Sequence, residues 1–144
     1  MHKVIFVMVL ALLLAACSQE GDNSANAATP AASGHKMGNM AQKVAVKKPR
    51  VPFKFGVGMK KFKTMCAQCH GEWGEGSDQG PPLMHDFYKP SHHGDPTFYN
   101  AALKGVKAHH WKLGDMPRVQ GATAKDVERI LPFIRWLQKE NGLY

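Results

Sequence analysis

Two cysteines and a histidine stand close together near the middle of the chain. Cys66 and Cys69 are separated by two residues, and His70 follows the second cysteine directly. Thiols and an imidazole at this spacing serve three chemistries: a redox-active disulfide pair, a structural zinc site, and covalent attachment of haem. Because each chemistry requires a different surrounding fold, this motif constrains the fold more than any other feature of the sequence.

The residues around the motif separate the three chemistries. A thioredoxin-like pair requires a βαβ setting, and no alternating strand pattern of useful length is present. A zinc site requires a second pair of ligands, which His85, His92 or His93 could supply only at irregular spacing. Cys-x-x-Cys-His is the signature of c-type haem attachment. Two residues between the thiols place two thioethers on one helical turn, and the imidazole of His70 can then reach the iron from beneath the ring.

The first residues have the features of an export signal. Lys3 is followed by an apolar run over residues 4–16. This run is shorter than the about 20 residues that a membrane-spanning helix needs, and it suits the apolar region of a secretory signal. The ending Leu14-Ala-Ala-Cys17 resembles the bacterial lipoprotein signal, which implies that Cys17 receives a diacylglycerol thioether and becomes the new N-terminus. An ordinary signal cleaved nearby is the alternative. By the same resemblance, Ser18 favours the outer membrane.

The number of cysteines agrees with lipid attachment at Cys17 together with haem attachment at Cys66 and Cys69. The chain has three cysteines, and an odd count in an exported protein requires an explanation. With lipid on Cys17, only Cys66 and Cys69 remain, in an oxidising compartment where a loose pair would form a disulfide. Covalent attachment of haem would use both of these remaining thiols.

Composition divides the rest of the chain into a tether and a domain. Residues 18 to about 50 are poor in large apolar side chains, so they cannot bury enough surface to offset the entropy of ordering. We therefore expect a signal peptide over residues 1–16 and a lipid-anchored flexible tether over residues 17–50, with a mean reach on the order of 30 Å. Residues 51–144 then form one small domain, whose modest core needs the help of a cofactor.

The formal net charge of the chain is +8. Many of the basic residues cluster around the expected start of the domain: Lys43, Lys47, Lys48, Arg50, Lys54, Lys60, Lys61 and Lys63. A basic run suits nucleic acid, an anionic membrane or an acidic partner, and export argues against nucleic acid. A solvated face without a dedicated partner is the alternative.

Three segments of the domain carry helix signals. Apolar residues spaced three to four apart predict a helix over 57–69 that runs into the cysteine pair. The segment 95–105 begins with Asp-Pro and ends with glycine, which predicts a second helix. A third is expected from Thr123 to Gly142, with a kink at Pro132. Because the remaining segments are rich in glycine and proline, we predict an all-α domain of about three to four helices with long loops.

With these elements in place, the chain resembles the class I monohaem cytochromes c over most of residues 51–144. In that family a glycine and an aromatic residue on the first helix pack against an aromatic residue on the last. Gly58, Phe62 and Trp136 stand at those positions. The resemblance implies a small cytochrome c fold, with long loops wrapped around one covalent haem c per chain, attached through Cys66 and Cys69.

The resemblance also implies roles for residues after the motif. The family often carries Gly-x-x-Gly-x-Gly and then Pro-Pro-Leu, which match residues 71–76 and 81–83 here. By resemblance, a carbonyl near Pro81 accepts a hydrogen bond from the second nitrogen of His70, which fixes a ligating imidazole. Leu83 is expected to pack on the haem.

A methionine is the expected sixth ligand of the iron. The family places a Met-Pro pair in a loop before the final helix, and Met116-Pro117 matches it. The resemblance therefore implies that His70 and Met116 are the two axial ligands. Core filling is the alternative, since methionine is a common gap filler. Replacement of Met116 on the iron by one of the histidines near residue 109 is a further alternative.

The domain is rich in histidine outside the motif. Five such residues are present: His85, His92, His93, His109 and His110. Imidazole and thioether suit copper, so these histidines could hold copper or zinc, with His35, Met37 and Met40 of the tether as further ligands. They could equally bind the haem propionates, cap loops or face solvent.

One haem with two strong axial ligands and no open position implies an electron carrier rather than an enzyme. We expect single-electron shuttling on the periplasmic side of a bacterial envelope. Acidic redox proteins would be steered to the haem edge by a basic rim, and the tether would keep the domain at the membrane. The alternatives are a haem enzyme that reduces peroxide or a gas-binding protein, each with a displaceable sixth ligand, and a copper-handling module.

Overall fold

The computed structural model describes residues 43–144, so Cys17, the expected signal peptide and most of the expected tether lie outside the described residues. Four α-helices are present in the described range: α1 (Gly56–Met65), α2 (Ala67–His70), α3 (Asp95–Lys104) and α4 (Ala124–Glu140). Short 3-10 turns precede α1 at Phe53–Phe55 and α3 at Asp86–Tyr88. The described part has no strand and one isolated β-bridge, which confirms the all-α prediction. Within residues 43–144, no helix combines the length and the apolar character that crossing a membrane would require.

The helix expected over residues 57–69 is divided at Cys66. This residue has φ −123° and ψ −33°, outside the helical conformation. Its carbonyl accepts from the backbone N–H groups of both Cys69 and His70, at 3.2 and 3.0 Å, which tightens the chain into a new turn. Cys69 and His70 therefore lie on the separate short helix α2, which Gly71 ends with φ 81°.

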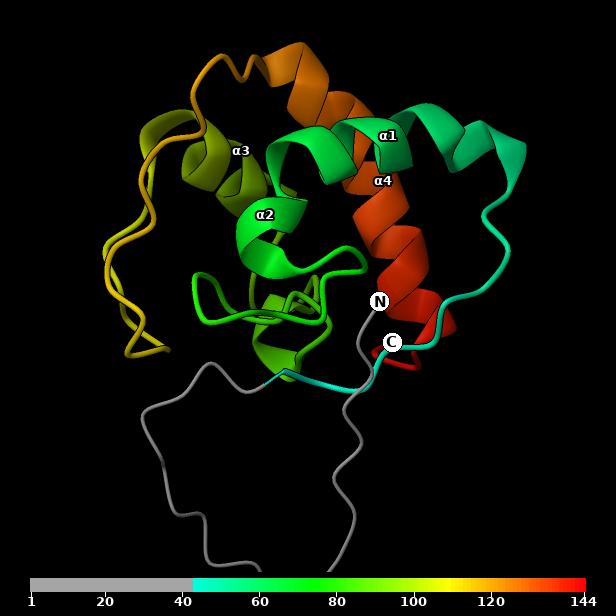
Figure 1. Ribbon diagram of the computed structural model, residues 1–144, viewed down its shortest axis with the longest axis horizontal. Coiled ribbons are helices and arrows are strands. Elements are labelled where there is room, and N and C mark those ends of the chain that lie inside the picture. Colours follow the sequence, from blue (N-terminus) through cyan, green and yellow to red (C-terminus); the bar gives the residue numbers. More distant parts are fainter. Residues whose placement is uncertain (1–42) are drawn as a thin grey trace, which may run out of the picture. The chain divides into compact units, whose positions relative to one another are not determined.

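The core lies where α1 crosses α4 (Figure 1). Gly58 allows the two backbones to approach closely, because a Cβ at this position would lie 2.3 Å from the carbonyl oxygen of Arg129. Beside it, the buried rings of Phe62 and Phe133 pack with centroids 5.6 Å apart. A glycine and an aromatic residue on α1 thus mark the crossing, as expected.

The aromatic partner of Phe62 differs from the expectation. Trp136 was expected in this position, but it stacks on Phe55, with ring centroids 5.3 Å apart. The reason is the position of the crossing, which lies at Phe133, about one helical turn before Trp136.

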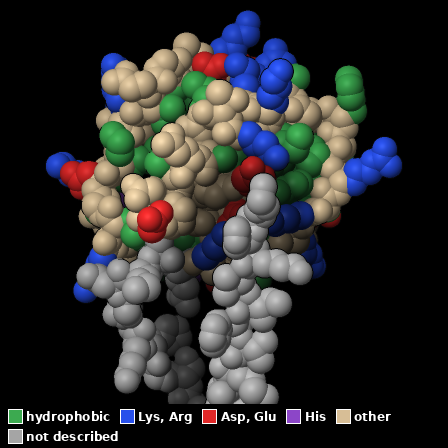
Figure 2. Space-filling model, viewed as in Figure 1, with side chains coloured by type: hydrophobic (Ala, Val, Ile, Leu, Met, Phe, Trp, Pro, Cys, Tyr) green, Lys and Arg blue, Asp and Glu red, His purple; other side chains and the backbone are tan. Residues whose placement is uncertain are grey.

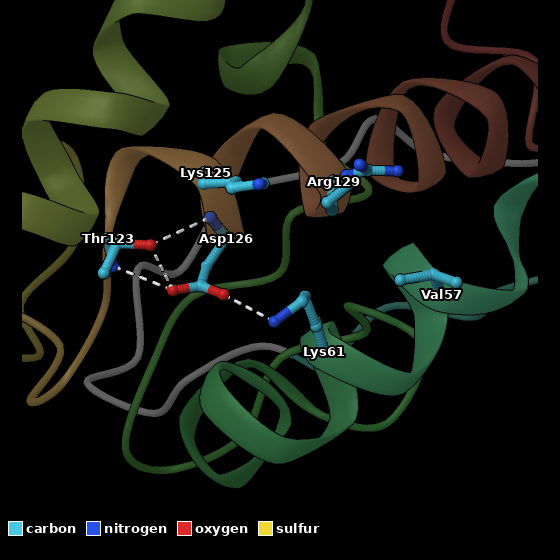
Figure 3. Close-up of a pocket in the computed structure, with 6 residues that line it drawn as sticks. All are labelled: Val57, Lys61, Thr123, Lys125, Asp126 and Arg129. Atoms are coloured by element: carbon cyan, nitrogen blue, oxygen red, sulfur yellow. Dashed lines mark hydrogen bonds and ion pairs between the residues drawn. The ribbon is translucent and has the colours of Figure 1, made fainter.

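A capping box starts α4 (Figure 3). The backbone N–H of Asp126 donates to Thr123 Oγ1 at 3.3 Å, and the N–H of Thr123 donates to Asp126 Oδ2 at 2.9 Å. The other carboxylate oxygen accepts from Lys61 Nζ at 2.5 Å, which ties the start of α4 to α1. The helix then continues through Pro132 as one element.

Residues before position 51 also contribute to the packed part of the chain. Val44 and Val46 pack against the hydrophobic core, and the N–H of Val44 donates to the carbonyl of Glu75 at 2.9 Å. Further along, Lys47 N–H donates to Asn141 Oδ1 at 2.7 Å. The packed chain thus includes residues that precede the domain boundary expected from composition.

Candidate functional site

His70 lies in the interior at the end of α2, with 8% of its surface exposed. Its Nδ1 is 2.8 Å from the carbonyl oxygen of Pro81. Because a carbonyl only accepts, Nδ1 carries the proton and Nε2 keeps a lone pair for a metal ion. Burial lowers the pKa of His70, and the hydrogen bond to Pro81 opposes this only in part. The ring is therefore neutral and oriented, as an iron ligand must be.

The loop after α2 turns back to bring Pro81 to His70. The N–H of Gly76 donates to the carbonyl of His70 at 2.7 Å, and Gly76 has φ 88°. A Cβ at residue 76 would lie 2.8 Å from the backbone nitrogen of Pro82. Both the backbone conformation and the lack of space require glycine here.

The two thiols of the motif are free, with Cys66 partly buried and Cys69 exposed. Burial, with a smaller effect of Cys69, raises the pKa of Cys66 to about 11. A redox-active thiol has a lowered pKa instead, which argues against a thioredoxin-like pair. The only cluster of potential metal ligands among the described residues contains no cysteine, which argues against a zinc site built on the motif.

Leu83 and Cys66 border the same apolar cluster. Leu83 is 7% exposed and belongs to the buried core, and Cys66 packs against this core from its edge. The structure therefore places the expected apolar side chain and the first expected thioether position on one hydrophobic surface. Their contact with haem remains a prediction.

Met116 lies at the end of a loop that is closed by backbone hydrogen bonds. The N–H groups of Val106 and Met116 each donate to the other residue's carbonyl at 2.9 Å. Gly105, with φ 83°, allows this pairing, because a Cβ there would lie 2.6 Å from the Met116 carbonyl oxygen. The Met116 side chain is partly buried but is not among those that pack against the core cluster. This argues against core filling, while ligation by Met116 remains a prediction.

Two polar residues of α4 that the sequence motifs do not predict position the segment before α3. Arg135 donates to the carbonyls of Tyr88 and His93, each at 2.7 Å. Gln138, which is fully buried, donates to the carbonyls of Leu83 and Tyr88 at 3.0 and 3.1 Å. The sequence signal for this role is the spacing of Arg135 and Gln138, which lie one helical turn apart on α4 beside its apolar face.

A shallow cavity of about 370 Å³ lies between α1 and α4 (Figure 3). It is lined by Val57, Lys61, Thr123, Lys125, Asp126 and Arg129. No expected site residue lines it, and its one carboxylate is already paired with Lys61. We therefore do not assign the functional site to this cavity.

The fold and the motif together define a small helical protein built to attach haem covalently. The family model described as cytochrome c matches residues 57–138, so the chain belongs to the cytochrome c family. Family membership confirms the predicted small all-α cytochrome c fold and implies a covalently attached c-type haem. It also supports haem-based electron transfer, the general role of the family. Neither a search of curated proteins nor a search of solved structures returned a match.

One buried polar atom fits the presence of haem. The Nε1–H of Trp111 is buried and has no hydrogen-bond partner among the described residues. A buried donor without an acceptor costs about 1–3 kcal/mol. The Tyr88 hydroxyl lies near this donor but forms no well-formed hydrogen bond with it, and the carboxylates of haem would be stronger acceptors. The residues present therefore fit a bound haem, as membership of the cytochrome c family implies.

Proposed function

We propose that this protein carries single electrons on the periplasmic side of a bacterial cell envelope, through a c-type haem with His70 and Met116 as axial ligands. Cys66 and Cys69 would provide the thioethers. The observation that carries the proposal is the hydrogen bond between His70 and Pro81. It leaves a buried imidazole directly after the two thiols with one nitrogen available to iron.

The chain's own residues suit rapid electron exchange. Haem iron supplies a one-electron couple, whose potential a methionine ligand raises. The His70 ring is fixed by the Pro81 carbonyl, and the Met116 backbone is fixed by its pairing with Val106. Ligands that are held in this way move little between oxidation states. Buried side chains such as Leu83 keep water away, which favours the less charged ferrous state.

Acidic redox proteins are the partners that we propose, with no role for nucleic acid. The net charge is +8, and Figure 2 shows Lys and Arg side chains at several separate places on one face. Such a field would raise the rate of association with acidic surfaces and would weaken as salt is added. The contacts would be brief, since both donor and acceptor must bind in turn.

The proposed anchor rests on the sequence alone. Removal of residues 1–16 would leave Cys17 as a lipid-bearing N-terminus, and the following segment would act as a tether to the membrane, with the outer membrane favoured. A tethered domain meets membrane partners at a raised effective concentration. Mass spectrometry of the purified mature protein tests this: it should show a diacylglycerol-modified Cys17, and a Cys17→Ala variant should be released from the membrane fraction.

The axial ligands can be tested by the near-infrared absorption of the ferric full-length protein loaded with haem. A sulfur-to-iron charge-transfer band is expected in the wild type and should be absent in Met116→Leu. Met59→Leu is the matched control, because Met59 packs against the core, and this variant should keep the band. A wild-type protein without the band, or a band that survives in Met116→Leu, would overturn ligation by Met116. His109 and His110 would then be the next ligands to test.

A further inference from the structure

Four histidines from the two segments that flank α3 meet in space. His92 and His93 precede α3, while His109 and His110 follow it. The Nε2 atoms of His92 and His110 are 3.2 Å apart, and those of His93 and His109 are 3.4 Å apart. One ring nitrogen from each of His92, His93 and His110 lies within 4.8 Å of the other two. The proposed electron-transfer function uses none of these side chains.

In two of the four rings, the nitrogen that points away from the cluster, Nδ1, contacts a backbone carbonyl oxygen. Nδ1 of His93 contacts the carbonyl oxygen of Phe87, and Nδ1 of His109 lies 2.8 Å from the carbonyl oxygen of Lys107. Because a carbonyl only accepts, Nδ1 carries the proton in both rings, and each neutral Nε2 presents a lone pair. The two Nε2 atoms are 3.4 Å apart, and either a proton on one of them or a metal ion bound nearby would relieve the repulsion of their lone pairs. A backbone carbonyl on the far nitrogen is also the usual partner of a metal-binding histidine.

The separation between the ring nitrogens of His92 and His110 matches one edge of the coordination shell of a tetrahedral ion. An ion with bonds of about 2.0–2.1 Å to nitrogen, as zinc has, sets its ligand atoms about 3.3–3.4 Å apart, because the edge of a tetrahedron is about 1.63 times the centre-to-corner distance. The observed separation is 3.2 Å, and a ring nitrogen of His93 lies within 4.8 Å of the other two. A square-planar ion with the same bond length would need its adjacent ligands closer, at about 2.9 Å.

The surroundings leave the cluster open to an ion. His92 is exposed, while His93 and His110 are partly buried. Burial lowers the pKa values of His93 and His110, and the neighbouring histidines lower them further. The positive charge of Arg135 also acts on His93, and the carboxylate of Asp95 accepts from that guanidinium at 2.9 Å.

We propose that His92, His93 and His110 form a second metal site, which binds a zinc ion in tetrahedral coordination. The fourth position is taken by water, since His109 is not among the residues whose ring nitrogens lie within 4.8 Å of one another. Zinc has no redox chemistry, so the ion does not exchange electrons with the haem. It joins two segments whose ligands are 18 residues apart in the chain, and so it fixes the loop that leads to Met116.

Calorimetric titration of the full-length, haem-loaded protein with zinc chloride, after treatment with a chelator, tests the site. We expect one saturable event with one zinc per chain, weakened at least tenfold in His92→Gln and in His110→Gln. Among the described residues, these two rings contact each other and not the backbone, unlike the ring of His93. The variants should therefore fold, and an unchanged haem spectrum would verify this. His35→Gln is the control for adventitious binding near the N-terminus and should bind zinc as the wild type does.

The outcomes that overturn the proposal are specific. Absence of a saturable event would remove the site, and so would equal affinities in the wild type and both cluster variants. Loss of binding in His35→Gln would move the site to the N-terminal segment. A parallel titration with copper(II) should also show binding, because copper(II) exceeds zinc in general affinity for such ligands. Copper binding without zinc binding would overturn the assignment of the ion.

Discussion

The carbonyl oxygen of Arg129 on α4 lies 2.3 Å from the point where a Cβ of residue 58 on α1 would stand. The two helices therefore cross with only the hydrogens of Gly58 between their backbones. The neighbouring atom is part of the α4 backbone and cannot rotate away as a side chain could. The crossing positions Phe62 on Phe133 in the core. Because α1 ends directly before Cys66, the same crossing also helps to position the thiols of the site.

Substitution of Gly58 by alanine should lower the free energy of unfolding by about 2 kcal/mol, the usual cost of overpacking. Gly56→Ala is the matched control on the same helix, because nothing lies within 4 Å of its Cβ position. It should leave stability unchanged or raise it by up to about 1 kcal/mol. Urea unfolding of both variants measures the difference, and equal stabilities would contradict the close crossing.

Replacement of Arg135 by lysine should lower the free energy of unfolding by about 2–3 kcal/mol, because a lysine cannot reproduce the planar set of donors. The guanidinium donates to the carbonyls of Tyr88 and His93 and to the carboxylate of Asp95, with a side-chain exposure of 12%. Arg129→Lys, at an exposed position of the same helix, should change stability by less than about 0.5 kcal/mol. Thermal unfolding of both variants measures the difference. If Arg135→Lys unfolds at the same temperature as the wild type, the hydrogen bonds of the guanidinium contribute little to stability.

Gly105→Ala should displace the backbone at Met116. Gly105 and Gly114 both have positive φ, 83° and 85°, so alanine is strained at either position by about 1–2 kcal/mol. Only at residue 105 would the new Cβ also meet a neighbour, the Met116 carbonyl oxygen at 2.6 Å. If Met116 binds iron, Gly105→Ala should weaken the charge-transfer band, while Gly114→Ala should retain it. If the two variants have the same spectrum, the backbone pairing of Met116 with Val106 is not needed for Met116 to bind the iron.

The contribution of Asp126 to stability should disappear in acid. The hydrogen bond from Lys61, followed by those from Thr123, lowers the pKa of Asp126 to about 2. A depressed pKa in the folded state means that the stabilisation is complete above the unfolded value near 4 and is lost as the pH falls through about 2. Unfolding midpoints of the wild type and Asp126→Asn should therefore differ above pH 4 and converge near pH 2. A constant difference across this range would contradict the shift.

Local signals in the sequence were enough to predict the helices α3 and α4. Thr123 and Asp126 stand at capping positions, and the structure has the capping box there. The glycine that ends the segment 95–105 caps α3, also as predicted. Such contacts involve residues three or four apart, so the spacing along the chain already contains their geometry.

Contacts between distant residues could be predicted only through the family resemblance, or not at all. The bond between His70 and Pro81 was expected on that basis, and the structure has it. The division of the first helix at Cys66 and the choice of Phe133 rather than Trp136 depend on how the elements meet in space, which periodicity does not specify. The convergence of His92 with His110 depends on the path of two loops around α3, and no local pattern encodes that path.

Two polar side chains of α4 hold the segment before α3 by its main chain, in addition to the core packing of Leu83 and Met84. Arg135 and Gln138 reach the carbonyls of Leu83, Tyr88 and His93, and every residue type offers that same acceptor. Side chains of the segment that lie outside the core are therefore free to change during evolution while these hydrogen bonds are kept. New chemistry, including imidazoles, can accumulate at such positions, because core packing and two residues elsewhere in the sequence secure the course of the main chain.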